Sequence, residues 1–171
     1  MGRKRKYKFT HQTMTLSDGT VLHRIKAIHH IPEAGVRKGD LGGWVEHKNN
    51  LSQSGSCWIF GNAKAYGQAV VSEHARLYDS VTIAGHAKIY GHAWAQEKAE
   101  IRDHAQVYDN AWIKGHAIVK DYAKLYHHAQ IEGKVILCGY AEICNGIFLN
   151  DDSIIHSETP IKDTYRLLKP V

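Results

Sequence analysis

The feature that most constrains the fold is a six-residue repeat that runs without an insertion over residues 61–144. Two of its members, "GHAKIY" and "GHAWAQ", follow one another at residues 85–96. In the fourteen hexads the third place is Ala twelve times and Val twice, and the fifth place is always Ile, Val, Leu or Ala. The first place is mostly Gly or Asp. A fixed short period of this kind dictates the architecture before any single element is considered.

The hexad period predicts strands and corners. An α-helix repeats its apolar face every 3.6 residues, which the hexads do not do. The third and fifth places lie two residues apart, as the inward side chains of a strand do, and Gly, Asp or Glu follows where the chain must turn. Three strands and three corners close a triangular coil of eighteen residues, and Ala suits its narrow core, which larger side chains would overpack. The sequence therefore predicts an all-β parallel β-helix of about six stacked coils.

The hexads, together with the stretch "GDLGGWVE…NLS…CWIFGNAKAYG", resemble the hexapeptide-repeat superfamily and within it a group of YdcK-like bacterial and phage proteins. The resemblance covers roughly residues 49–156. It implies that the β-helix winds in the left-handed sense. It also implies a phage-encoded protein whose partners include a host protein, such as a defence factor.

Three regions follow from this pattern. Residues 1–48 are expected to form a basic arm and a β-hairpin cap, residues 49–156 the β-helix, and residues 157–171 a C-terminal tail. The turn sequence "LSDGT" predicts the hairpin, and Trp44 is expected to be buried over the first coil, whose open strand edges need a cover. The tail is expected to cover the last coil through Tyr165, Leu167 and Leu168.

Composition excludes several classes of protein. No apolar stretch approaches the roughly 18 residues that cross a membrane, and the N-terminus lacks the apolar core of a secretory signal. Three cysteines without a CxxC pair favour reduced thiols and a cytoplasmic location. The formal charge is +5, and the basic residues 3–8 are interpreted as a solubilising end that can also touch phosphates.

The histidines occupy one recurrent position. Six of them stand at the second place of a hexad, where Asn, Tyr, Gln, Ser and Lys also occur: His74, His86, His92, His104, His116 and His128. Such a mixture indicates a polar corner rather than a ligand set. Zinc needs three or four ligands that converge on one point, and stacked pairs supply only two. We therefore predict no metal, no cofactor and no catalytic residue.

Acyl transfer is the alternative function. The resemblance implies that hexapeptide acyltransferases place a general-base His near the coils and bind coenzyme A between subunits. They commonly interrupt the coils with a loop, whereas residues 61–144 run without one. A general base also needs a neighbour that orients it and a pocket that excludes water, which a smooth prism does not supply.

The third outer face carries the candidate binding site. Aromatic side chains and an arginine, which are enriched at binding hot spots, recur there every eighteen residues: Trp58, Phe60, Arg76, Tyr78, Trp94, Trp112 and Phe148. A contiguous apolar patch marks an interface, so this strip predicts a non-enzymatic binding or assembly module. Its expected partner is a second copy, in a dimer or trimer, or a host protein. The alternative is that the cap or tail buries the strip, and nucleic acid is disfavoured because Gln130 and Glu132 interrupt the basic run.

Overall fold

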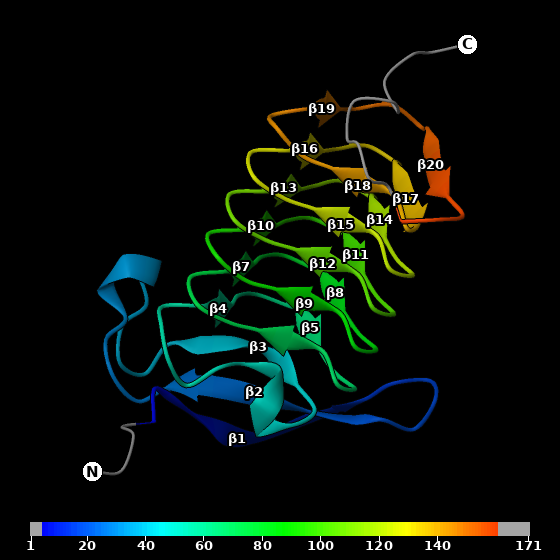
Figure 1. The fold of residues 1–171 in the computed structure, drawn as a ribbon. Coiled ribbons are helices and arrows are strands. Elements are labelled where there is room, and N and C mark those ends of the chain that lie inside the picture. Colours follow the sequence, from blue (N-terminus) through cyan, green and yellow to red (C-terminus); the bar gives the residue numbers. More distant parts are fainter. Residues whose placement is uncertain (1–4, 161–171) are drawn as a thin grey trace.

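The chain folds as an all-β parallel β-helix in the computed structural model, which describes residues 5–160 (Figure 1). Strands from successive coils line up into three sheets, one on each side of the triangular column. The first sheet has nine strands, in the order β1 (Tyr7–Thr15), β2 (Val21–Ala27), β3 (Leu41–Val45), β5 (Lys64–Ala65), β8 (Thr82–Ile83), β11 (Glu100–Ile101), β14 (Ile118–Val119), β17 (Ile136–Gly139) and β20 (Ile154–Ser157).

The other two sheets contain only strands of the coils. The six-stranded sheet comprises β4 (Trp58–Ile59), β7 (Arg76–Leu77), β10 (Trp94–Ala95), β13 (Trp112–Ile113), β16 (Gln130–Ile131) and β19 (Phe148–Leu149). The five-stranded sheet comprises β6 (Val70–Val71), β9 (Lys88–Ile89), β12 (Gln106–Val107), β15 (Lys124–Leu125) and β18 (Glu142–Ile143). The predicted parallel β-helix is therefore confirmed.

The pairing register follows the eighteen-residue coil. Trp94 pairs with Arg76 on one side and with Trp112 on the other. The backbone N–H of Trp94 donates to the carbonyl of Ala111 on the next coil at 3.0 Å. The third and fifth places point inward, as Ala87 and Ile89 do with no exposed surface. Since the register is constant, side chains at the same place of every third hexad form straight rows on the surface.

The first place of each hexad is a corner with left-handed backbone. All fourteen first-place residues have a positive φ, among them Gly85 at 68° and Asp121 at 60°. Glycine adopts this conformation freely, whereas other residues pay a cost. At several corners a carboxylate recovers part of that cost, because Asp121 accepts a hydrogen bond from the N–H of Gly139, eighteen residues on, at 2.9 Å. This explains why Gly alternates with acidic residues at the first place.

The N-terminal segment extends the nine-stranded sheet beyond the coils by three strands, β1, β2 and β3. Strands β1 and β2 form the antiparallel hairpin predicted from "LSDGT", and β3 pairs antiparallel with β2 and parallel with β5. Trp44 is buried there as predicted, with 9% of its surface exposed. We refer to residues 5–48 as the cap.

Gly42 and Gly43 allow β3 to lie directly on the first coil. A Cβ atom on Gly42 would come within 2.6 Å of the Ile25 side chain, and one on Gly43 would collide with Ile59 and the Ala63 carbonyl. Of the three glycines in "GDLGG", only Gly39 has a positive φ. Gly42 and Gly43 therefore allow close packing and do not form a turn.

Two three-residue 3-10 helices, η1 (Pro32–Ala34) and η2 (Lys48–Asn50), interrupt the strands of the cap region. Among residues 5–160 no helix is long and apolar enough to span a membrane. The predicted tail contacts of Tyr165, Leu167 and Leu168 lie outside the described residues.

The narrow core makes a direct prediction about the third place. Ala105 lies between Ala87 and Ala123 on the adjoining coils, all fully buried. We expect Ala105→Leu to lower the free energy of unfolding by about 1–3 kcal/mol through overpacking, and Ala105→Val to cost less because Val81 and Val135 occupy the same place. Urea unfolding measures both. Ala84→Leu, on the outward sixth place, is the matched control, and equal stability of Ala105→Leu and Ala84→Leu would contradict a tight column.

Candidate functional site

Rows of aromatic side chains line two of the outer surfaces. On the five-stranded sheet the rings of Tyr90, Tyr108 and Tyr126 stack in parallel, with centroids 4.9 and 5.0 Å apart. Burial raises the pKa of Tyr108 to about 12 and raises the pKa of Tyr126 as well. These phenols stay neutral near pH 7, so the row stabilises the stack of coils rather than supplying an acid or base.

The histidines form stacked pairs at the corners. His86 lies parallel to His104 with ring centroids 4.8 Å apart, and His74 lies parallel to His92 at 4.5 Å. Each stacked pair supplies two imidazole rings, whereas zinc needs three or four ligands that converge on one point. Within the described chain, no group of three or more His, Cys, Asp or Glu side chains is placed to hold a metal ion.

The six-stranded sheet carries the predicted aromatic strip, which we call the tryptophan face. Its rows are in the predicted register, so Trp94 and Trp112 are neighbours on adjoining coils. The prediction was wrong for Trp58, which has no exposed surface. The ring of Tyr7 packs edge-on against Trp58 with centroids 6.4 Å apart. The cap therefore buries the first member of the strip, as the alternative interpretation anticipated for part of it.

The remaining members of the strip stay at the surface. Trp94 and Trp112 are each 36% exposed and meet edge to face at 6.1 Å, and Phe148 is 53% exposed. Phe60 and Tyr78 are half-buried and stack on each other at 4.6 Å. The guanidinium of the half-buried Arg76 lies over the Trp94 ring, 5.5 Å from its centroid. The strip is thus a ridge of indole rings with a cation at its lower end.

A groove of about 360 Å³ runs between this ridge and the neighbouring corner. The ridge side combines two indoles with a guanidinium and an amide, and the corner side adds an imidazole and a second amide. Its lining residues are Arg76, His92, Trp94, Asn110, Ala111, Trp112 and Gln130. The groove therefore places two indole rings among hydrogen-bonding groups from both of its walls.

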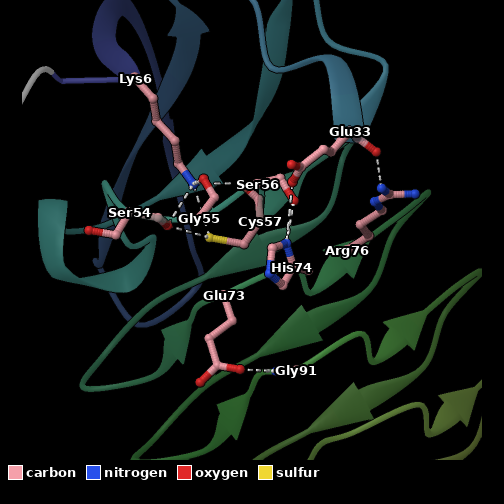
Figure 2. Close-up of polar contacts among 10 residues, drawn as sticks. All are labelled: Lys6, Glu33, Ser54, Gly55, Ser56, Cys57, Glu73, His74, Arg76 and Gly91. Atoms are coloured by element: carbon pink, nitrogen blue, oxygen red, sulfur yellow. Dashed lines mark hydrogen bonds and ion pairs between the residues drawn. The ribbon is translucent and has the colours of Figure 1, made fainter.

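The loop between β2 and β3 contacts the coils beside Arg76, one of the groove residues (Figure 2). Glu33, in η1 of this loop, accepts a hydrogen bond from the Arg76 guanidinium through its backbone carbonyl. The Glu33 carboxylate lies 3.4 Å from Nδ1 of His74. The hydroxyl of Ser56 lies 2.7 Å from the same nitrogen. The cap thus supplies the loop and the orienting carboxylate that the coils alone lack.

This arrangement orients the His74 ring. A carboxylate can only accept, whereas the Ser56 hydroxyl can donate or accept, so a hydrogen on Nδ1 is compatible with both neighbours. In that tautomer Nε2 carries no hydrogen and can act as an acceptor. The His74 side chain is 39% exposed and stacks on His92, which lines the groove, whereas His74 itself does not line it. His74 therefore has two attributes of a general base, a neighbouring carboxylate and a position next to a groove.

A buried lysine fixes the cap next to this cluster (Figure 2). The Lys6 ammonium donates to the carbonyl of Cys57 at 2.8 Å and lies 3.0 Å from its thiol. It also donates to the carbonyls of Ser54 and Gly55. Burial lowers the pKa of Lys6 and raises the pKa of the Cys57 thiol. The thiol is therefore an inert packing group, and the ammonium ties β1 to the start of the first coil.

Sequence reasoning missed several residues of this site. Glu33 and Ser56 lie outside the hexads, and no periodic signal links them to His74. His92 and Asn110 were recognised only as corner residues. Their place in the groove could have been inferred from the register, because both lie two residues before an exposed tryptophan.

The comparisons with known proteins add one relative. No protein-family model matches the chain. The chain is 37% identical over 81 residues to a protein named "Uncharacterized acetyltransferase YdcK" from Escherichia coli strain K12. The match covers 43% of this chain and 24% of the relative, so it spans about a quarter of that protein's length. The expected resemblance to YdcK is thus found as a local similarity.

The tryptophan face predicts a distinct fluorescence behaviour. Two of the four tryptophans, Trp44 and Trp58, are buried, and Trp94 and Trp112 are partly exposed. We expect acrylamide to quench only part of the emission, and we expect the double variant Trp94→Phe/Trp112→Phe to lose that accessible part. Trp44→Phe is the control that keeps it. A wild-type protein as resistant to quenching as the double variant would show that this face is covered in solution.

Proposed function

We propose that the tryptophan face binds an acyl thioester of the coenzyme A type and that the protein transfers the acyl group to a hydroxyl or amine, with His74 as the general base. One observation carries the proposal: the Glu33–His74 pair adjoins an open groove on a β-helix, because His74 stacks on His92, which lines the groove. The local similarity to a relative named as an acetyltransferase supports the same reaction class.

The lining of the groove suits such a thioester. The pantetheine arm of coenzyme A alternates amides with methylene groups, and the groove offers the amides of Asn110 and Gln130 beside the apolar indole rings. The Arg76 guanidinium supplies a positive charge for phosphate oxygens. Indole faces also suit stacking of an adenine ring.

The transfer step needs only groups found at this end of the groove. Nε2 of His74 takes the proton from the acceptor's hydroxyl or amine while the acceptor's oxygen or nitrogen bonds to the thioester carbonyl carbon. The carbon–sulfur bond then breaks, and the sulfur leaves with the proton that His74 returns. The products are the acylated acceptor and a free thiol. Glu33 stabilises the imidazolium that forms in between.

Kinetics of two His74-site variants test this role. We expect His74→Gln to lower the rate of thiol release from acetyl-coenzyme A, measured with a panel of amino and hydroxyl acceptors, by about 10²–10⁴-fold, the usual contribution of a general base. Glu33→Gln should lower it less, because the base remains but loses its orienting carboxylate. Acetyl-coenzyme A should still raise the melting temperature of both variants, since binding depends on the groove.

His86→Gln is the matched control for these variants. His86 stacks on His104 as His74 stacks on His92, but on another corner. Its substitution should leave thiol release unchanged. If millimolar acetyl-coenzyme A fails to shift the melting temperature of the wild-type protein, the proposal is wrong.

A second candidate function is protein docking on the same face. The exposed Trp94, Trp112 and Phe148 side chains favour it, because a row of exposed aromatic rings is typical of an interface. The simplest occupant is a second copy of this chain, and two tryptophan faces related by a two-fold axis would bury each other's ridges. The other candidate partner for the tryptophan face is a host protein.

The oligomeric mass tests docking. We expect light scattering after size exclusion to give a dimer or trimer for the wild-type protein and a monomer for Trp94→Arg/Trp112→Arg, because two buried cations would repel across the interface. Lys88→Glu, on the five-stranded sheet, is the control that keeps the wild-type mass. A wild-type monomer would favour a different protein as the partner and contradict self-association.

A further inference from the structure

The positive charge of this protein lies in its first 48 residues. They contain ten Lys or Arg residues and four Asp or Glu residues. The whole chain contains 22 Lys or Arg residues and 17 Asp or Glu residues. The remaining residues, with twelve basic and thirteen acidic side chains, are nearly neutral. An anionic partner attracted by charge would therefore approach the cap rather than the coils.

A pocket of about 200 Å³ lies beside β1. Strand β1 is the edge strand of the nine-stranded sheet (Figure 1). Three cations, two aromatic rings and an amide line the pocket, and none of its lining residues is acidic: Arg5, Tyr7, Lys8, Phe9, Lys48 and Gln53. We call it the cap pocket. Its volume suits one nucleotide unit rather than a double helix, which is much wider than the pocket.

The cations of the cap pocket have no carboxylate partner among residues 5–160. Arg5, Lys8 and Lys48 are exposed and take part in none of the ion pairs there. On the coils, by contrast, Lys114 and Lys124 pair with carboxylates at 3.2 and 2.7 Å. The cap pocket therefore keeps its positive charge uncompensated.

A second observation points to an anion at the same edge. Lys8 lies directly opposite Lys26 in the pairing of β1 with β2. Like charges directly opposite each other destabilise a sheet. A phosphate bound between them would remove that repulsion, and phosphates of a strand lying across β1 and β2 would meet the two lysines in turn.

The aromatic rings decide which anion fits. Phe9 is half-buried and stacks on His23 with ring centroids 4.8 Å apart, so its ring is held in place at the pocket. Tyr7 is buried, with 2% of its surface exposed, and its hydroxyl donates to the carbonyls of Lys48 and Leu51, so it supports the pocket from below. The half-buried Phe9 ring beside exposed cations is the kind of surface that unpaired bases use, because bases stack while phosphates pair with the charges. A polyanion without bases would leave the Phe9 ring unused.

We propose that the cap pocket binds single-stranded nucleic acid, with phosphates on Arg5, Lys8 and Lys48 of the pocket and on Lys26, which pairs with Lys8 across the sheet, and with a base against Phe9. This site is separate from the tryptophan face, so its function does not depend on acyl transfer. Three or four phosphate contacts imply that the logarithm of the binding constant falls with the logarithm of the salt concentration with a slope of about −2 to −3.

Fluorescence anisotropy with the full-length protein and a labelled oligothymidylate of twelve nucleotides tests the proposal. We expect Lys8→Glu/Lys48→Glu to weaken binding at least tenfold and to reduce the salt slope by about 1.4, the value for two lost phosphate contacts. The control is Lys88→Glu/Lys98→Glu, which changes the net charge equally at exposed positions on the coils. Lys8→Glu should also raise the melting temperature, since it removes the repulsion from Lys26, and this confirms that the variant folds.

Two further probes separate nucleic acid from other polyanions. Phe9→Leu, which keeps an apolar side chain, should weaken oligothymidylate binding several-fold and leave heparin binding unchanged. An abasic oligonucleotide of the same length should bind more weakly than oligothymidylate. The proposal is overturned if both double-charge variants weaken binding equally, or if heparin and the abasic strand bind as tightly as oligothymidylate.

Discussion

The rest of this structure depends on one constraint: the backbone hydrogen bonds that join each coil to the next, at a constant spacing of eighteen residues. Each strand is only two residues long in most coils, so no strand is stable by itself. Stability comes from repetition, since every coil covers the inward Ala and aliphatic side chains of its neighbours. The same repetition fixes the surface, because any side chain placed once recurs as a row. Tyrosine, histidine and tryptophan rows are therefore consequences of the register, whether or not a given row has a function.

This regularity explains how far the sequence could predict the molecule. The hexad phase alone gave the three sheets, the inward places and the contact of Trp94 with Trp112. It could not give the burial of Trp58, because that depends on Tyr7, which lies 51 positions earlier in a segment without a period. The Glu33–His74 contact escaped prediction for the same reason. Periodic positions are set by local geometry, whereas contacts between the cap and the coils are set by how one irregular loop folds back.

The coils and the cap consequently contribute different things. The coils present straight, nearly neutral rows with grooves between them. The cap adds a carboxylate beside His74, a loop whose Glu33 carbonyl accepts from Arg76, and an excess of positive charge. Both proposed sites thus depend on residues of the cap, either for the whole pocket or for the carboxylate beside His74. This agrees with the general tendency of functional groups to sit on irregular segments held by a rigid scaffold.

The two sites also share a mechanical support. Lys6 lies between Arg5 and Tyr7 of the cap pocket, and its ammonium holds Cys57, the neighbour of Ser56, which contacts His74. Burying an ammonium is costly unless its hydrogens are satisfied, and here backbone carbonyls of the first coil satisfy them. Those carbonyls are correctly spaced only when residues 54–57 hold their present turn. Because the same turn positions Ser56 against His74, loss of the Lys6 contact would disturb both the cap pocket and the end of the groove, whereas the coils beyond β7 would keep their own register.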